Sequence, residues 1–590
     1  MSLSTEDVPA RTTDAGTSAA IEVADLCFTY PGASEATLHG VSLQIERGDF
    51  VAVVGGNGSG KTTLCKTFNG LVPHFWNGDI TGVVRVNGRS TAGVSVAEIA
   101  QDVGYVFQDF GNQLVRPTVR DDVAFGPLNF GHDDWRERTE RALRALSIED
   151  IAGTHTWQLS GGQQHLTALA GALALAPSIL VVDEPAAEVD PGRAAVLYDH
   201  LTQLNAQGIT VVVIEHHAEL VARYARSVVL MADGAVRWHL PVAEALSRTA
   251  DLEEADIPAP QVVAAARALD PAVAAGERLA PLSVQECAEL VRATTGVPAD
   301  GGAVTDGGAD TSEGKGSNGG VVAQASDIEV AYQSVDGGKS VVIEGLDLEL
   351  REGERVALVG SNGAGKSTLL SALAGLTLPR RGTVVVDGYD TRRLTAAELA
   401  GTVCYLVQRP EQMFLQDSVR ADVAMYPTGR NMVDAEELVD EVLSRVELTH
   451  LADRDGRLLS GGQQRRATLA IGLAMRPTLL LLDEPTSSLD LRSRDDVIAM
   501  LAALSEHIRC SVVATHDMQL VAEWADRVVV LDHGRVIADL PPAELFASPG
   551  VLHQARLVPP QVSQLGAVLG LRPIPLTVAD LVARLTKEDT

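Results

Sequence analysis

The amino-acid sequence is an internal repeat, in which the same short patterns occur twice, 300 positions apart. The pattern LSGGQ occupies 159–163 and 459–463, DEP occupies 183–185 and 483–485, and a histidine follows an apolar run at His216 and His516. Repetition at a fixed spacing indicates that one structural unit is duplicated. A chain of 590 residues is also too long for one domain. We therefore expect two copies of one fold.

Each copy contains a pattern that binds phosphates. Residues 55–62 read GGNGSGKT after the apolar run FVAVV, and residues 360–367 read GSNGAGKS after RVALV. Such a loop between a strand and a helix turns its backbone N–H groups toward phosphates, its lysine reaches the outer phosphates, and the next hydroxyl binds Mg²⁺. The predicted nucleotide ligands in these loops are Gly55, Asn57, Gly58, Ser59, Gly60, Lys61, Thr62, Thr63, Gly360, Asn362, Gly363, Ala364, Gly365, Lys366, Ser367 and Thr368.

A second motif is an apolar run that ends in two carboxylates, ILVVDE at 179–184 and LLLLDE at 479–484. Continuous apolar runs are typical of parallel strands that helices cover on both faces. We expect Asp183 and Asp483 to hold Mg²⁺ through water, and Glu184 and Glu484 to polarise the attacking water. The fold class is therefore α/β, with a mostly parallel sheet flanked by helices in each copy.

The motif LSGGQ identifies the family. Ser160 and Ser460 precede helices whose first N–H groups can bind a γ-phosphate. Together with the phosphate loops, LSGGQ resembles the ATP-binding-cassette (ABC) family over nearly the whole chain. The resemblance implies two P-loop ATPase domains, each with a helical subdomain that carries LSGGQ, and ATP hydrolysis with Mg²⁺. It also implies head-to-tail cassettes, in which each ATP lies between one phosphate loop and the opposite LSGGQ.

The same resemblance assigns further residues. The site built on Lys61 would use the opposite Ser460, Gly461, Gly462 and Gln463, and the site built on Lys366 would use Ser160, Gly161, Gly162 and Gln163. Gln108 and Gln408 match the family's catalytic glutamine, His216 and His516 match its switch histidine, and Tyr30 and Tyr332 match its adenine-stacking aromatic. An ordinary strand tyrosine remains an alternative for Tyr332. The metal ligands implied are Thr62, Gln108, Asp183, Ser367, Gln408 and Asp483.

Two segments indicate the kind of cassette protein. VFQDFGNQLVRPTVRDDVAFGPLNFG (106–131), with a looser copy at 407–427, resembles the ATPases of energy-coupling-factor (ECF) importers. This implies a transmembrane scaffold (T) subunit, a substrate-binding membrane (S) subunit, and a peripheral place on the cytoplasmic face of the cell membrane. The cargo of such importers is a vitamin, a vitamin precursor or a transition-metal ion. We expect the scaffold to contact Gln113, Leu114, Gln412, Met413 and Phe414, and Phe75 and Trp76 to be exposed for a partner or folded onto the sheet.

Charge and linker composition weigh against other functions. A net charge of −31 disfavours a nucleic-acid ligand, which needs clustered Lys and Arg. A soluble tandem-cassette translation factor of the ABC-F type would need a long, charged, helical linker suited to ribosomal RNA, whereas residues 301–320 contain eight glycines. The fused ATPase of a sugar importer is a second alternative. The apolar, uncharged run 166–182 is short for a membrane span.

The domain boundaries follow from the repeat and from composition. We expect a disordered tail at 1–19, the first ATPase domain at 20–248 with a helical tail at 249–298, a flexible Gly-rich linker at 299–322, and the second ATPase domain at 323–548 with a helical tail at 549–590. The tails share the patterns PQV (260–262, 560–562) and PL[ST]V. Packing of each tail on its own cassette is the simpler interpretation, and a regulatory or dimer-stabilising element is the alternative.

The two copies also differ near these motifs. Arg465 and Arg466 follow the second LSGGQ, where the first copy has His165 and Leu166, and Ser487 and Ser488 stand where the first copy has Ala187 and Glu188. In the facing arrangement the first-copy residues belong to the site built on Lys366. Because extra negative charge opposes an anionic transition state, we expect the Lys61 site to carry most of the turnover.

Overall fold

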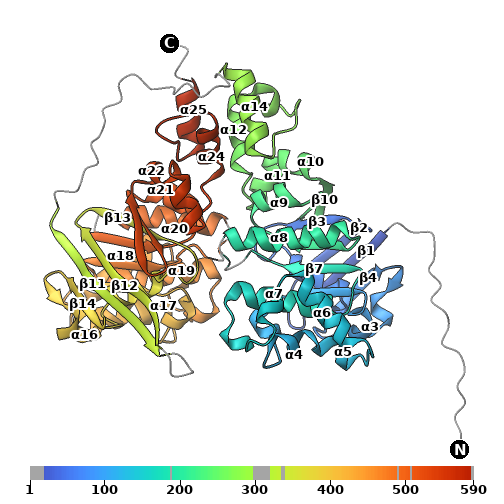
Figure 1. Cartoon of the computed structure of the whole chain (residues 1–590), viewed down its shortest axis with the longest axis horizontal. Coiled ribbons are helices and arrows are strands. Elements are labelled where there is room, and N and C mark those ends of the chain that lie inside the picture. The colour runs from blue at the N-terminus through green and yellow to red at the C-terminus, as the bar shows by residue number, and fades with distance from the viewer. Residues whose placement is uncertain are drawn as a thin grey trace, which may run out of the picture. The chain divides into compact units, whose positions relative to one another are not determined.

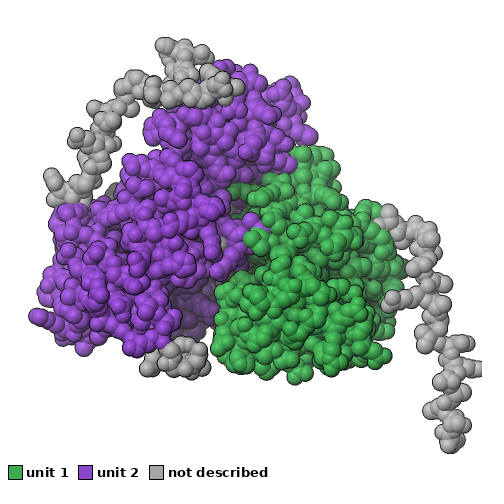
Figure 2. Space-filling view, in the orientation of Figure 1, with its two compact units in different colours: residues 1–185, 196–245 green, residues 186–195, 246–590 purple. Residues whose placement is uncertain are grey.

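Each copy of the repeat forms two sheets with matching strand order (Figure 1). The computed structural model describes residues 19–186, 189, 191–296, 319–333, 339–487, 489, 491–504 and 508–586. The chain divides into unit 1, Met1–Pro185 with Val196–Ala245, and unit 2, Ala186–Ala195 with Leu246–Thr590, which Figure 2 colours separately.

The larger sheet of each copy has six strands. All of them are parallel except the edge strand that comes last in the sequence, β10 or β20. The strand orders are β10-β9-β3-β8-β7-β6 and β16-β17-β18-β13-β19-β20. The phosphate loop follows β3 or β13. The acidic pair lies at the end of β7 or β17, and one strand, β8 or β18, separates the two in the sheet. The carboxyl ends of these parallel strands therefore bring the two motifs together. The strands are β3 (Phe50–Val54), β6 (Val103–Val106), β7 (Ile179–Asp183), β8 (Thr210–Ile214), β9 (Ser227–Ala232), β10 (Ala235–Pro241), β13 (Glu354–Val359), β16 (Val403–Leu406), β17 (Leu479–Asp483), β18 (Cys510–Ala514), β19 (Arg527–Asp532) and β20 (Arg535–Leu540).

The smaller sheet of each copy is antiparallel and has four strands, in the orders β2-β1-β4-β5 and β12-β11-β14-β15. Its strands alternate buried and exposed residues, as in β2, because one face packs on the core. The strands are β1 (Ala19–Thr29), β2 (Leu38–Glu46), β4 (Asp79–Val86), β5 (Arg89–Ser90), β11 (Val321–Gln333), β12 (Lys339–Arg351), β14 (Arg381–Val386) and β15 (Tyr389–Asp390).

Helices accompany the sheets and confirm the predicted α/β fold class. The first copy contains α1 (Lys61–Phe68), α2 (Leu71–His74), α3 (Val96–Ile99), α4 (Val119–Val123), α5 (Phe125–Asn129), α6 (Trp135–Ala145), α7 (Gly161–Leu173), α8 (Pro191–Ala206), α9 (Ala218–Tyr224), α10 (Val242–Ser247) and α11 (Thr249–Glu254). The second contains α15 (Lys366–Leu373), α16 (Ala396–Leu399), α17 (Val419–Gly429), α18 (Ala435–Arg445), α19 (Gly461–Ala474), α20 (Leu491–Leu504), α21 (Met518–Trp524), α22 (Pro542–Phe546) and α23 (Pro549–Ala555). The predicted LSGGQ helices are α7 and α19.

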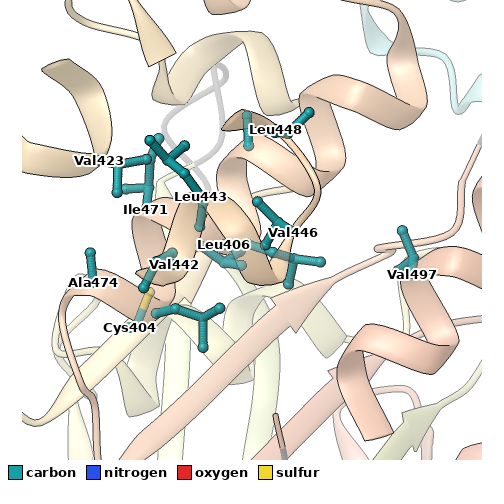
Figure 3. Close-up of a cluster of buried hydrophobic side chains, with 14 of the residues drawn as sticks. Cys404, Leu406, Val423, Val442, Leu443, Val446, Leu448, Ile471, Ala474 and Val497 are labelled. Carbon is teal, nitrogen blue, oxygen red and sulfur yellow. The ribbon is translucent and has the colours of Figure 1, made fainter. Parts of the chain in front are cut away.

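The helical subdomain of the second copy is held by one apolar cluster, shown in Figure 3. Helix α18 places Val442 and Leu443 in this cluster, α19 contributes Ile471, and Leu406 extends it to β16. Apolar residues three and four apart form one stripe along α18, which explains why this helix packs here. The cluster joins the LSGGQ helix to the strand that precedes Gln408.

The helical tails of the two copies share a core within unit 2. The helices α12 (Gln261–Leu269) and α14 (Val284–Thr295) of the first tail pack with α24 (Gln561–Val568) and α25 (Val578–Thr586) of the second (Figure 1). The short helix α13 (Pro271–Ala274) lies beside α12. The second tail also packs on its own cassette, since Leu557 and Ile574 join a cluster with β13 and β19. The expectation that each tail packs on its own cassette is therefore incomplete.

Reciprocal hydrogen bonds join the tails at their matched PQV patterns. The side-chain oxygen of Gln561 accepts from the backbone N–H of Val262 (3.2 Å), and that of Gln261 accepts from Val562 (3.0 Å). Each glutamine thus satisfies an N–H in the first turn of the opposite helix, a group that no bond within its own helix can satisfy. The repeated PQV sequence is explained by this symmetric contact.

Among the described residues, none of the helices has the length and apolar character that a membrane crossing requires.

Candidate nucleotide site

The phosphate loop of the first copy wraps around its own lysine. Gly55, Gly58 and Gly60 all have positive φ, and a Cβ on Gly55 would lie 2.2 Å from the carbonyl oxygen of Met231, so that position requires glycine. The Lys61 ammonium is buried and donates to the carbonyl oxygens of Gly55 and Gly56, both at 2.8 Å. The loop therefore holds a desolvated cation beside the N-terminus of α1, an arrangement that suits phosphate oxygens.

The second copy repeats this geometry and shows a pocket at the loop. Gly360 and Gly365 have positive φ, and Lys366 donates to the carbonyl of Gly360 at 2.8 Å. The pocket has a volume of about 180 Å³ and is lined by Val342, Asn362, Gly363, Gly365, Lys366, Ser367, Thr368, Gln408, Asp483 and Glu484. The structure thus brings the phosphate loop, Gln408 and the acidic pair of this copy to one cavity, whereas Ser460–Gln463 are outside its lining.

The first acidic pair lies where β7 ends. Asp183 is 3.5 Å from the Thr62 hydroxyl and accepts from the Tyr105 hydroxyl at 3.1 Å. Burial, with the neighbouring Glu184 charge, raises the pKa of Asp183 to about 6. A hydroxyl and a carboxylate that face each other match the oxygen ligands Mg²⁺ prefers, so these residues fit the predicted metal site.

Glu184 is held by the two residues predicted to act with it. Gln108 donates from Nε2 to one carboxylate oxygen at 2.6 Å, and Nε2 of His216 lies 2.9 Å from the other. Although burial raises the pKa of Glu184, the hydrogen bond and charge of His216 keep it below its usual value. The backbone of Glu184 is left-handed (φ 49°), a strained state for a non-glycine residue that functional sites retain.

The second acidic pair has the same backbone but a different histidine contact. Glu484 is buried with φ 47°, and its carboxylate lies 2.9 Å from Nδ1 of His516, the other ring nitrogen from that used by His216. Tyr405 donates to Asp483 at 3.0 Å, as Tyr105 does to Asp183. The sequence prediction missed both tyrosines, although their recurrence 300 positions apart was a usable signal.

The two predicted adenine-stacking tyrosines differ. Tyr30 is half-buried, its hydroxyl is 3.2 Å from that of Thr63, and its ring lies edge-on to Phe28. Tyr332 is 45% exposed near the end of β11. Tyr30 is therefore fixed beside its phosphate loop, whereas the pocket of the second copy is lined from this sheet by Val342 rather than by Tyr332.

The LSGGQ helices begin with matching caps. Ser160 and Ser460 are N-caps whose hydroxyls accept from the N–H of Gln163 and Gln463, and each glutamine side chain accepts in return from the serine N–H. This capping box satisfies two N–H groups of each helix start. The γ-phosphate contacts of these residues concern the opposite cassette and stay a prediction.

The residue after each LSGGQQ faces its own cassette. Arg465 is buried and donates to the backbone carbonyls of Val407 and Gln408, while His165 is buried and stacked on Phe110 at 4.4 Å. Arg465 therefore braces the loop of Gln408 in its own cassette. Of the other residues that differ between the copies here, Ala187, Glu188 and Ser488 lie outside the described residues.

In the segments after Gln108 and Gln408, most of the residues expected to contact the scaffold are not the exposed ones. Gln113 folds back, since its amide bonds Phe107 N–H and the Tyr105 carbonyl, and Phe414 is buried in the apolar cluster of the subdomain. Gln412 is exposed, and Leu114 and Met413 are half-buried. The strongly exposed apolar residues lie one position further on, at Val115 (60%) and Leu415 (64%).

The aromatic pair Phe75 and Trp76 divides between its two expected placements. Phe75 is 69% exposed, whereas Trp76 packs on the core of the sheet with the Lys66 ammonium 4.1 Å from its ring.

Comparison with known proteins gives consistent matches. A family model described as "ABC transporter" matches residues 38–187 and 343–487. A relative from Methanosarcina acetivorans, named provisionally as an ABC transporter ATP-binding protein, is 33% identical over 97% of this chain and 92% of its own. A Streptomyces avermitilis protein with the same name is 36% identical over 92% of this chain and 98% of its own. The solved structure of cbiO1 from Clostridium perfringens, described as part of the complex cbiONQ, is 29% identical with a TM-score of 0.36 and covers 40% of this chain and 94% of that one.

Proposed function

This chain belongs to the ABC transporter ATPase family, with two tandem ATP-hydrolysing cassettes, and we propose that it drives an ECF-type importer of a vitamin, a vitamin precursor or a transition-metal ion. The observation that carries the proposal is a pair of exposed apolar sites at matched positions beside the two Gln loops. They lie within the segments 106–131 and 407–427 that resemble ECF ATPases.

Each apolar site combines two exposed side chains. Val115 (60% exposed) and Phe125 (40%) correspond to Leu415 (64%) and Met425 (43%). The sites are continuous, because Arg116 lies over the Phe125 ring at 5.2 Å and the Gln416 amide is 3.7 Å from the Met425 sulfur. Single exposed apolar residues are ordinary, but the same pair in both copies favours one partner with two docking elements. We assign these sites to cytoplasmic helices of the transmembrane scaffold subunit.

At each ATP site we assign water activation to Glu184 or Glu484. The neighbouring histidine lowers the pKa of this carboxylate and so favours its ionised form, and the buried site fixes its position, as a general base requires. Gln108 holds Glu184, and Gln408 lines the pocket of the second copy. Mg²⁺, when bound at Thr62 and Asp183 or at Ser367 and Asp483, would neutralise phosphate charge. The opposite LSGGQ helix would complete each site, in the head-to-tail arrangement that the family implies.

The shared tail core suggests how the cassettes stay together between ATP-bound states. The first tail follows the first cassette in sequence, yet α12 and α14 pack on α24 and α25. A contact of this kind raises the effective concentration of one cassette near the other. We propose that the tails keep the cassettes associated when ATP does not.

Membrane recovery tests the importer proposal. The full chain with Val115→Asp and Leu415→Asp should lose membrane association while its ATP binding stays within about twofold, because a charge in an apolar contact is costly to desolvate. The matched control carries Val83→Asp and Val433→Asp, on valines that are also exposed. Release by the first pair and retention by the second supports the proposal. Equal membrane recovery of both pairs, or sedimentation of the native chain with ribosomes, refutes it.

A further inference from the structure

The loop that carries the switch histidine differs between the copies. The second copy reads Thr515-His516-Asp517, and the first reads Glu215-His216-His217. Both loops follow a fully buried strand, β18 or β8, and both histidines lie 2.9 Å from the carboxylate that we assign to water activation. The residues that position each histidine are therefore relevant to the ATPase activity itself, whichever transport system it serves.

In the second copy, Asp517 connects three segments. One carboxylate oxygen caps α21 by accepting from the N–H groups of Gln519 and Leu520, both at 3.0 Å. The other accepts from Nε of Arg494 in α20 at 2.9 Å and from the hydroxyl of Thr486 at 3.2 Å. Thr486 is two residues beyond Glu484, so the loop of His516 is tied to the segment that follows the catalytic carboxylate.

This network is buried and charged. Thr486 is 8% exposed, and the side chain of Arg494 is 11% exposed and also lies 3.9 Å from Glu523. Although burial raises the pKa of Asp517, the guanidinium of Arg494 keeps it below its usual value. Removing one member of a buried, hydrogen-bonded pair leaves the other unsatisfied, so the network has a defined geometry rather than many alternatives.

The first copy has none of these groups at the matched positions. Thr486, Arg494 and Asp517 correspond to Ala186, Ala194 and His217, and Glu523 corresponds to Arg223. A methyl group can neither donate nor accept a hydrogen bond, so Ala186 and Ala194 cannot rebuild the connection. All four positions of the network therefore differ between the copies, and a neutral substitution at a single position does not explain this.

Another buried carboxylate holds the first switch loop instead. Glu215 is 1% exposed, and one of its oxygens accepts from the N–H groups of His216 and His217 at 2.8 and 2.9 Å. The other accepts from the Tyr198 hydroxyl at 2.5 Å. The Tyr198 ring stacks on Phe50 of β3 and on Tyr224 of α9, so this loop is anchored to the sheet core.

The second copy cannot form this alternative anchor. Its residues at the positions of Glu215 and Tyr198 are Thr515 and Ile498. Isoleucine has no hydroxyl to donate, and threonine has no carboxylate to accept two N–H groups and a hydroxyl at once. In the second copy the Thr515 hydroxyl accepts only the N–H of Asp517, at 3.0 Å. The two copies therefore hold their switch loops to the rest of the cassette through different side chains.

We propose that Thr486, Arg494 and Asp517 are positioning residues that link His516 to the loop after Glu484, whereas Tyr198 and Glu215 position His216 independently of the matching loop. Displacement of the loop after Glu484 then stops hydrolysis in the second cassette. Displacement of the matching loop after Glu184 does not stop hydrolysis in the first. The two ATP sites differ in what controls them, in addition to any difference in rate.

Vanadate trapping of 8-azido-ATP on the full chain tests this link, because trapping requires hydrolysis and the labelled peptide identifies the copy. Thr486→Val removes only the hydroxyl, and Arg494→Met removes the charge at similar length. Each should lower trapping on second-copy peptides roughly 10–100-fold, the cost of misplacing a catalytic group. Trapping on first-copy peptides should fall less than about threefold in the same samples. Tyr198→Phe should show the opposite preference.

Two controls separate positioning from folding. Photolabelling with 8-azido-ATP at low temperature without vanadate measures binding and should be retained on both copies. The combined Thr486→Val and Arg494→Met variant should lose no more trapping than the worse single variant, since the two residues act through Asp517. Equal loss on both copies, loss of binding together with trapping, or unchanged trapping in all variants overturns the proposal.

Discussion

The shared tail core offers the sharpest test of how the cassettes are joined. Leu565 in α24 is fully buried in the cluster that contains Val262, Val263 and Cys287 of the first tail. Leu565→Ala removes most of a buried side chain and leaves a cavity, which costs about 2–5 kcal/mol at such sites. Val568 is in the same helix but is 39% exposed, so Val568→Ala is the matched control.

We expect Leu565→Ala to open the tail core before either cassette unfolds. If the substitution lowers the free energy of local opening of the tail core by about 2 kcal/mol, the amide exchange rates in α12, α14 and α24 should rise by about 30-fold. Hydrogen exchange by mass spectrometry resolves these helices, and exchange at the phosphate loops serves as the internal reference. Val568→Ala should change exchange less than about threefold.

The ATP dependence of turnover links this opening to function. A loosened tail lowers the effective concentration of the opposite cassette, so Leu565→Ala should raise the ATP concentration for half-maximal hydrolysis with little change in the maximum. If exchange rises only in α24, or if Leu565→Ala and Val568→Ala give the same exchange and the same ATP dependence, the tails do not couple the cassettes.

The remaining predictions concern the ATP sites and one buried histidine. Glu184→Gln with Glu484→Gln should lower ATP turnover by roughly 10²–10⁴-fold and spare binding, as rapid-quench and equilibrium binding assays would show, and full turnover would disprove water activation by these residues. Lys61→Ala and Lys366→Ala should each abolish binding at one of two sites, and calorimetry that still finds two tight sites in the double variant would contradict the assignment. His165, whose pKa burial lowers to about 4, must be neutral when folded, so stability should fall by about 1 kcal/mol from pH 7.5 to 5.5 and continue to fall toward pH 4. His165→Phe should lose that part of the pH dependence of thermal unfolding, and an unchanged pH dependence would show that His165 does not titrate in this way.

Local sequence patterns were sufficient for the cassette fold and for the neighbourhood of each phosphate loop and its acidic pair. The loop GGNGSGKT, the strand ending in Asp183 and Glu184, and the capped helix at Ser160 each carry their chemistry within a few residues, so the pattern and the structure coincide. The family resemblance placed Gln108 and His216 in the same site as Glu184, but their contacts with its carboxylate come from the structure.

Contacts between distant segments were not predictable in the same way. The sequence showed that PQV is repeated but not that Gln261 and Gln561 bond each other's helices, because pairing of remote helices leaves no local pattern. Arg465 follows LSGGQ, and its contact with the carbonyl of Gln408 in its own cassette likewise leaves no local pattern. Glu215 gave a usable signal that was missed: a carboxylate at the end of the apolar run TVVVI needs a buried partner.

The central claim is that this ATPase drives an ECF-type importer, and the membrane proteins that purify with the chain test it most directly. An affinity-tagged full chain, solubilised from its own membranes in mild detergent, should bring down a transmembrane scaffold together with one or more small substrate-binding membrane proteins, one copy of this chain per scaffold. The Val115→Asp and Leu415→Asp variant should lose all of them together. Recovery of paired permease subunits with a separate binding protein, or of ribosomal proteins in place of membrane proteins, would contradict the account.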